Sequence, residues 1–245
     1  MLARFAPSRR SLAVGAGLIA IAAGLYTVAR QTSAFAISTL EVTGAPASVD
    51  QQVKRSLAPL LGTNLLSLDG AALERRAEAL PTVVSIGYDR AFPHTLRIRV
   101  VPERPVAVLH RGNETWLVSA RGRVVERIPT GTDPALARIW VPRKADVAVG
   151  AFLAPEGGGT AARTLASAVR FPARIATVSL ARGELVFRLR SGLELRLGDP
   201  TDVRLKLAIA RRALLRLPTG ATYLDVSVPG RPVAGADNPQ LSSTG

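Results

Sequence analysis

The chain has no cysteine, two histidines and few aromatic residues. Without thiols it forms no disulfide and no thiolate metal site. A metal site would need His94 and His110 together with carboxylates, at a ligand spacing that the sequence does not show. Aromatic residues make up 4% of the chain, which is little for a surface that stacks nucleic-acid bases. The sequence therefore argues against a metal centre and against nucleic acid as a partner.

No catalytic constellation is recognisable either. The sequence has no Ser-x-x-Lys, and neither histidine lies in a nucleophile motif. The run Gly157-Gly158-Gly159 lacks the Lys-Ser/Thr that ends a phosphate-binding loop, which indicates a flexible connector. The carboxylate pairs Glu74/Glu78 and Asp199/Asp202 are better explained as a solvated helix face and a helix start. We therefore predict that the chain is not an enzyme and takes no cofactor and no small-molecule substrate.

One long uncharged run stands out against this background. It is SLAVGAGLIAIAAGLYTVA, residues 11–29. At a helical rise of about 1.5 Å per residue it spans roughly 28 Å, close to the ~30 Å hydrocarbon core of a bilayer. No second run of this kind follows. The sequence therefore predicts a single-pass membrane protein with residues 1–10 as a short tail and the bulk of the chain on the other side.

The charges beside this run predict its orientation. Three arginines and no acid precede it, namely Arg4, Arg9 and Arg10. Only Arg30 follows it closely, so the positive-inside rule places the N-terminus in the cytoplasm and the bulk outside. A cleaved signal peptide is the alternative, because residues 34–36 form a small-x-small pattern. The apolar run exceeds the about 7–15 residues of a signal peptide, which favours a retained anchor.

The net charge of +14 is spread along the chain. Only three of the 32 basic residues are lysine, which we interpret mainly as compositional bias. This charge fits attraction to an anionic membrane surface or to an acidic partner, and it also fits a merely solvated surface.

Residues 35–104 have the pattern of a small α+β module. Alternating apolar residues predict three strands, at residues 37–42, 84–88 and 96–100. Between the first two strands, one helix is predicted to start at Ser48, with Gln51 at capping-box spacing, and another at Asp69, a candidate N-cap. The order is strand, helix, helix, strand, strand. The alternation predicts an antiparallel sheet with its apolar face on the helices.

Residues 105–235 predict a mixed or antiparallel β-rich domain with packed helices, one of them at 160–169. Leucines and a phenylalanine alternate in 185–189 and again in 193–197, as in a hairpin. Only a three-residue loop, 190–192, places Leu189 opposite Leu193, with Gly192 in a left-handed conformation.

The C-terminal part is predicted to be a helix followed by a strand. Asp199 is predicted to cap a helix that has Pro200 at its first position and runs to about residue 217. A last strand follows at 223–228, and 230–233 extends it. Residues 236–245 are short and polar and are predicted to be a disordered tail.

In this order, several short phrases resemble the bacterial cell-division family FtsQ/DivIB. They are ISTLEVTG at 37–44, LLSLD at 65–69, LPTV at 80–83, FPHTLRI at 92–98, ERPVA at 103–107 and YLDV at 223–226. The resemblance covers nearly the whole chain. It implies a cytoplasmic tail, one transmembrane helix, a POTRA domain at 35–104 and an FtsQ-type β domain at 105–235.

The resemblance also implies a function and a site. The function is a non-enzymatic scaffold of the division complex at the septum, which links early and late division proteins through extracytoplasmic contacts. The implied partners are FtsB/FtsL-type coiled-coil subunits and FtsW/FtsI-type septal synthases. The family holds FtsB, with FtsL alongside, through late strands of the β domain. The matching positions are Tyr223, Leu224, Asp225, Val226, Ser227, Val228, Gly230 and Val233.

Two alternatives stay open at this point. Leu224, Val226 and Val228 also fit plain core or edge packing. The chain also fits an exported POTRA-type polypeptide-binding module of envelope protein assembly, although that class usually carries tandem modules and the pattern occurs once here.

We expect the basic residues before the apolar run to set the topology. Replacing Arg4, Arg9 and Arg10 together by glutamate removes the charge bias, so a reporter fused after Gly245 should show mixed sidedness. A fully exported reporter would show that other features fix the orientation. Mass spectrometry of the mature wild-type protein is the companion measurement. An N-terminus at Ile37 would contradict the retained anchor.

Overall fold

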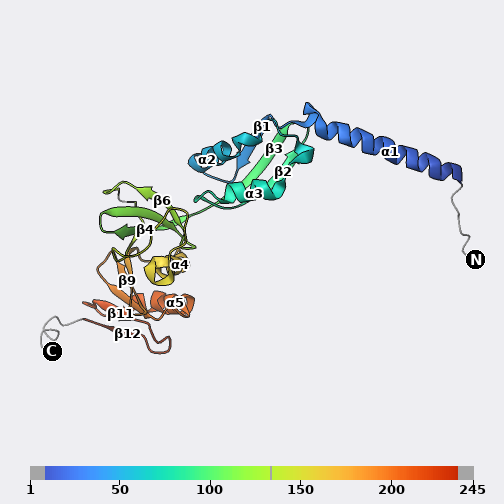
Figure 1. The fold of residues 1–245 in the computed structure, drawn as a ribbon. Helices are drawn as coiled ribbons and strands as arrows, with labels where there is room; N and C mark the ends of the chain where they lie inside the picture. The colour runs from blue at the N-terminus through green and yellow to red at the C-terminus, as the bar shows by residue number, and fades with distance from the viewer. Residues whose placement is uncertain (1–8, 133, 237–245) are drawn as a thin grey trace, which may run out of the picture. The chain divides into compact units, whose positions relative to one another are not determined.

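The computed structural model describes residues 9–132 and 134–236 (Figure 1). The chain divides into two compact units, Met1–Pro102 and Glu103–Gly245, and each is described by itself. The predicted fold class is confirmed: an N-terminal apolar helix, a β-α-α-β-β unit and a β-rich unit with packed helices. The expected tails at 1–10 and 236–245 lie almost wholly outside the described residues.

The first helix, α1 (Arg9–Gln31), contains the whole uncharged run. Its segment Leu12–Gln31 is long and apolar enough to cross a membrane, and none of it is buried in the protein. Large apolar side chains along it, such as Leu18 and Ile19, are exposed. A helix that is apolar all round needs an apolar surrounding, so α1 fits a single-pass anchor.

The rest of the first unit is a three-stranded sheet covered by two helices. Its elements are β1 (Thr39–Thr43), α2 (Ala47–Leu57), α3 (Gly70–Glu78), β2 (Val83–Ala91) and β3 (Thr95–Pro102), with short helical turns η1 (Ser33–Phe35), η2 (Ala58–Leu60) and η3 (Leu65–Ser67). The strand order is β1-β3-β2. Alternate residues of β3, Leu96, Ile98 and Val100, are buried in one core with Val53 and Leu73 of the helices.

Two local predictions for this unit were wrong. The sheet is not antiparallel throughout, because β1 runs parallel to β3. After the two helices the chain runs along β2 and turns back into β3, so β3 has the direction of β1, and alternation along a strand does not encode this direction. Ser48 does not cap α2, since the helix already begins at Ala47, after Pro46. Asp69 does cap α3, and its Oδ1 accepts a hydrogen bond from the Ala72 amide at 3.1 Å.

The second unit is built on one mixed sheet. The described residues give nine strands in the order β12-β11-β10-β9-β8-β7-β4-β5-β6. They are β4 (Pro105–Arg111), β5 (Glu114–Ser119), β6 (Val124–Ile128), β7 (Ala137–Trp140), β8 (Ile175–Ala181), β9 (Glu184–Leu189), β10 (Glu194–Gly198), β11 (Tyr223–Asp225) and β12 (Val233–Gly235). The pairs β4–β7, β7–β8 and β10–β11 are parallel, and the other pairs are antiparallel.

Two helices cover one face of this sheet, α4 (Thr160–Ser167) and α5 (Val203–Leu214) (Figure 1). Leu109 of β4, Phe187 of β9 and Leu195 of β10 are fully buried in the core beneath the helices, together with Leu165 of α4 and Leu207 of α5. Burial of each large side chain contributes about 1.5–3 kcal/mol, so this single core holds the unit together.

The β9–β10 hairpin follows the prediction. Arg188 is paired with Glu194 and Phe187 with Leu195, and the Leu189 amide donates to the Leu193 carbonyl at 2.9 Å. Gly192 is in the left-handed region with φ of 92°. The three-residue loop is therefore confirmed.

The last elements differ from the prediction. The strand expected at 223–228 ends at Asp225, because the Asp225 carboxylate accepts the Ser227 amide at 2.8 Å and closes a turn. The chain then returns as β12, antiparallel to β11. The helix expected from Pro200 begins only at Val203, after Asp202, which has a positive φ of 48°.

The glycine run at 157–159 is a closely packed turn, η4 (Pro155–Gly159), in which Gly158 and Gly159 are buried. A Cβ on Gly159 would lie 2.5 Å from the Leu153 carbonyl oxygen. This oxygen is a backbone atom, so it cannot move away as the end of a flexible side chain could. A Cβ on Gly157 would meet only the Ala154 Cβ at 3.6 Å, an ordinary contact. The run is therefore a packing feature of the second unit.

We expect Gly159→Ala to destabilise the second unit by about 1–3 kcal/mol, because it overpacks a tight contact. Gly157→Ala is the matched control and should change stability by less than about 0.5 kcal/mol. Both tryptophans of the chain, Trp116 and Trp140, lie in this unit, so urea unfolding followed by tryptophan fluorescence reports on it. Equal midpoints for the two variants would contradict the packing argument.

Candidate partner-docking edge

The sheet of the second unit has an open edge at β12. Within residues 134–236 this strand is paired with β11 on one side, and no described strand lies on its other side. Alternate residues of an edge strand point amide and carbonyl groups away from the sheet, where another chain can pair with them. The edge first expected at β11 is thus covered by β12, and β12 takes its place.

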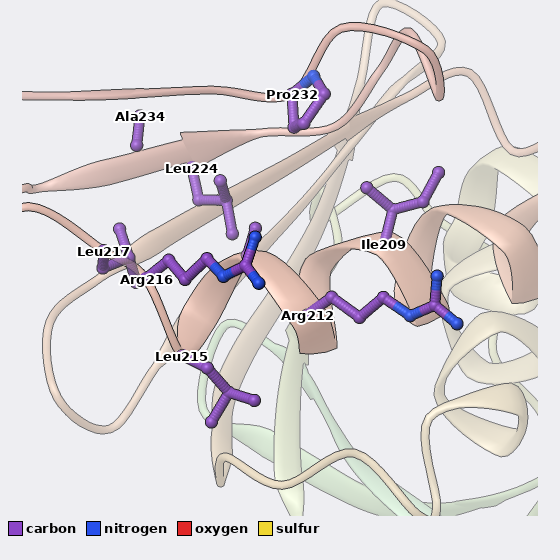
Figure 2. A pocket seen from close by; sticks show the side chains of 9 residues that line it. Ile209, Arg212, Leu215, Arg216, Leu217, Leu224, Pro232 and Ala234 are labelled. Atoms are coloured by element: carbon purple, nitrogen blue, oxygen red, sulfur yellow. The ribbon is translucent and has the colours of Figure 1, made fainter.

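An apolar groove runs beside this edge, between α5 and the pair β11–β12 (Figure 2). Its volume is about 760 Å³. Figure 2 shows Leu224 pointing from β11 toward the helix and Ile209 pointing from the helix toward the strands. The lining residues are Ile209, Arg212, Ala213, Leu215, Arg216, Leu217, Leu224, Pro232 and Ala234. The last turn of α5 and the edge strand thus line one hollow.

The rim of the groove combines exposed apolar side chains with positive charge. Leu215, on the helix side of the groove, is 86% exposed. Arg212 and Arg216 come from the last turn of α5 and its continuation and carry the basic charge of the rim. Apolar surface flanked by arginine is typical of interface cores and of their anchor residues.

Tyr223 is the first residue of β11 and is paired with Gly235 of the edge strand β12. The Arg196 guanidinium sits 4.4 Å from its ring centroid, a cation–π contact. A Cβ on Gly235 would lie 2.8 Å from the Tyr223 hydroxyl, so the ring reaches over β12 only because position 235 is glycine. Glu194 pairs with Arg196 at 2.8 Å and with Arg188 at 3.4 Å. A row of polar side chains therefore leads across the strands to the edge.

The start of α5 is held by a buried lysine. Lys206 is 2% exposed, and its Nζ donates to the Asp199 carbonyl and to its carboxylate, both at 2.9 Å. Hydrogen bonds from Thr201, and then from Lys206, hold the pKa of Asp199 well below its ordinary value of 3.8. The Asp199 carboxylate thus binds Thr201 and Lys206, and α5 begins only at Val203, so the predicted cap was wrong. This contact fixes α5, and with it one wall of the groove.

The structure places the eight predicted site residues in three groups. The side chains of Leu224 and Val226 belong to the core. Tyr223 and Asp225 of β11 and Ser227 after it are half-buried, whereas Val228 and Gly230 in the turn and Val233 of β12 are exposed. The expectation that these residues bind a partner stays a prediction.

Sequence reasoning missed the helix wall of the groove. Leu215 and Leu217 follow the apolar stripe of α5 and come together with Pro232 and Ala234 only through the fold. The sequence did offer one indication of an exposed apolar residue here, because Leu215 directly follows Leu214, the last residue of the apolar stripe. No cluster of three or more histidine or carboxylate side chains suited to a metal ion occurs within the described residues.

An apolar helix that fits a membrane anchor, followed by a small β-α-α-β-β unit and a β-rich unit, is the architecture of a protein with a POTRA-type module. The family model described as "POTRA domain, FtsQ-type" matches residues 35–103. Several curated relatives carry the name cell division protein FtsQ. The chain thus carries an FtsQ-type POTRA domain and is similar to cell division proteins of the FtsQ/DivIB family.

Three relatives show the extent of the likeness. FtsQ of Streptomyces coelicolor is 26% identical over 255 residues, which cover 94% of this chain and 90% of that protein. FtsQ of Streptomyces venezuelae is 26% identical over 59% of this chain and 58% of its own length. FtsQ of Acinetobacter oleivorans is 26% identical over 56% and 50%. The chain thus spans about half the length of the last two relatives.

We expect Asp199→Asn to change how the second unit responds to acid. A carboxyl whose pKa is lowered in the folded state stabilises above its unfolded value of 3.8, and this contribution is lost as the pH falls. The wild type should therefore lose stability between about pH 5 and pH 3, and the variant should start less stable and lose less over this interval.

The control for this experiment is Glu184→Gln, which changes an exposed carboxyl on β9 of the same unit. It should keep the wild-type slope of unfolding midpoint against pH, measured by tryptophan fluorescence. An unchanged slope in Asp199→Asn would show that the Lys206 contact does not hold α5 electrostatically.

Proposed function

We propose that the chain is a non-enzymatic, membrane-anchored scaffold of the division complex, which links early and late division proteins at the septum. Its open β12 edge beside an arginine-rimmed apolar groove is the observation that carries this proposal. In this layout residues 1–10 are cytoplasmic, 11–29 cross the membrane, and the POTRA domain (35–104), the β domain (105–235) and the tail (236–245) are extracytoplasmic. The charge bias around α1 supports this orientation.

The proposed occupant of the edge is a coiled-coil subunit of the FtsB type, with an FtsL-type subunit alongside. A short extended segment of that subunit adds a strand to β12, so main-chain hydrogen bonds supply part of the affinity. A neighbouring helical segment lays apolar side chains into the groove against Leu215 and Leu217. Acidic residues of the partner meet Arg212 and Arg216, which steers association and fixes the register.

The predicted site residues take different roles in this arrangement. Val228, Gly230 and Val233 are exposed and contact the partner directly, and Tyr223 offers its ring and hydroxyl above the strand. Asp225 and Ser227 shape the turn that brings β12 back. Leu224 and Val226 support the site from the core, and Leu224 also forms the floor of the groove.

Septal synthases of the FtsW/FtsI type are proposed as further partners of the assembled complex. The alternative function is binding of unfolded polypeptides by an exported POTRA-type module. Copurification from solubilised membranes separates the two functions, because a scaffold retains division subunits and a polypeptide-binding module retains unrelated unfolded chains.

We expect Leu215→Lys and Val233→Lys each to weaken binding of the coiled-coil partner by about tenfold or more, equal to about 1.4 kcal/mol. Each change places a long charged side chain on an apolar surface that the partner covers. Leu215 and Val233 are exposed, so neither change should disturb the fold. The measurement is titration of the full-length chain with the purified partner.

Val169→Lys is the matched control, since Val169 is an exposed apolar residue of the same unit outside the groove lining. It should bind as the wild type does. Wild-type affinity in both Leu215→Lys and Val233→Lys would reject the groove and the edge as the docking site.

A further inference from the structure

The outer end of α1 is tied to the POTRA module by one buried side chain. Asn64 is 9% exposed, and its Nδ2 donates to the Ala29 carbonyl at 2.7 Å and to the Thr32 carbonyl at 2.8 Å. Its Oδ1 accepts the Leu66 amide at 2.8 Å, which caps η3. One amide group thus satisfies carbonyls at the end of the membrane helix and holds the module against that end.

Two loops of the module lie on the segment that leaves the helix. Ile37 exchanges backbone hydrogen bonds with the loop after α2, donating to Thr63 and accepting from Gly62, both at 2.9 Å. The turn between β2 and β3 lies on the other side, where the Ser38 amide donates to the His94 carbonyl at 2.9 Å. The His94 ring adds a contact of 3.1 Å between its Nδ1 and the Ala36 carbonyl oxygen.

This end of the module exposes apolar side chains. Phe92, at the β2–β3 turn, is 52% exposed, and Leu61, in the loop after α2, is 47% exposed. Phe92 also meets Phe35, just past the helix, edge to face at 5.6 Å between ring centroids. Apolar rings and leucines gathered beside the end of a membrane helix are what the membrane–water interface accepts.

The same end carries almost no charge. No acidic or basic residue occurs between Arg30 and Glu41, in residues 56–68, or in residues 91–96, where only His94 titrates. Over the whole chain, 20% of the residues are charged. Seating this end in the interface therefore requires no charge to leave water, and the absence of acids suits anionic headgroups.

We propose that Phe35, Leu61 and Phe92 form a bilayer-contacting end of the POTRA module, seated about 5–10 Å deep at the boundary between headgroups and acyl chains. The occupant of this surface is the lipid bilayer itself. The two hydrogen bonds from Asn64 to the Ala29 and Thr32 carbonyls, here called the Asn64 latch, set the depth of the module in the bilayer. They fix the module within a few residues of the point where α1 leaves the hydrocarbon. This inference rests on the proposed membrane anchor. According to this proposal, the POTRA module is held against the membrane surface and does not reorient freely about a flexible linker.

The test uses the full chain in nanodiscs. The chain has no cysteine, so single cysteines place an environment-sensitive fluorophore at chosen sites. Phe92→Cys and Leu61→Cys probe the proposed contact. Val101→Cys is the matched control, because Val101 is a 49% exposed apolar residue at the opposite end of β3, about 20 Å along the strand. Leu18→Cys, near the middle of the apolar run, reports insertion of α1 with a nitroxide placed deep in the acyl chain.

Nitroxide groups on the upper acyl chain should quench the fluorophore at positions 92 and 61 severalfold more than at 101. This should hold in phosphatidylcholine alone and in mixtures with phosphatidylglycerol, because the contact is apolar. Strong quenching at 18 with equal, weak quenching at 92 and 101 would overturn the inference and leave the anchor intact. Absent quenching at 18 would contradict the anchor and the inference together.

Asn64→Asp tests the latch separately. Aspartate keeps an oxygen for the Leu66 amide and loses both donors to the Ala29 and Thr32 carbonyls. Quenching at position 92 should fall, and the thermal unfolding of the variant, followed by circular dichroism, should show that the module is still folded. Unchanged quenching in a folded Asn64→Asp variant would overturn the role of the latch.

Discussion

The parallel pairing of β10 with β11 is the constraint on which the candidate docking surface depends. Parallel neighbours need a crossover, because the chain must return to the same end of the sheet before the second strand begins. Here α5 makes that crossover, and Lys206 holds its first turn. The last turn of α5 then lies beside β11. The groove is the space that remains between this turn and the strand pair at the edge of the sheet.

Elements whose evidence is local were predictable from the sequence. The apolar run, the hairpin loop at 190–192 and the cap at Asp69 each follow from neighbours within a few residues. Alternation along a strand shows which face is buried, so the cores of both units were largely foreseen. The order of elements then defined the fold class, because few architectures accommodate it.

Features that depend on distant residues were not predictable. Asp199 has the sequence context of a helix N-cap, but its carboxylate accepts a hydrogen bond from the buried Lys206, seven residues later. The helix wall of the groove and the Asn64 latch join segments far apart in the chain. Each of these contacts is specified by the fold and leaves no periodic signal in the sequence.

The central claim is that β12 and the end of α5 receive a coiled-coil division subunit. Hydrogen exchange of the full-length chain, with and without that partner, tests it most directly. We expect slowed amide exchange at Val233–Gly235 and in the segment after α5, with unchanged exchange in α2 and α3 of the POTRA module. Unchanged exchange at β12 under saturating partner would contradict it.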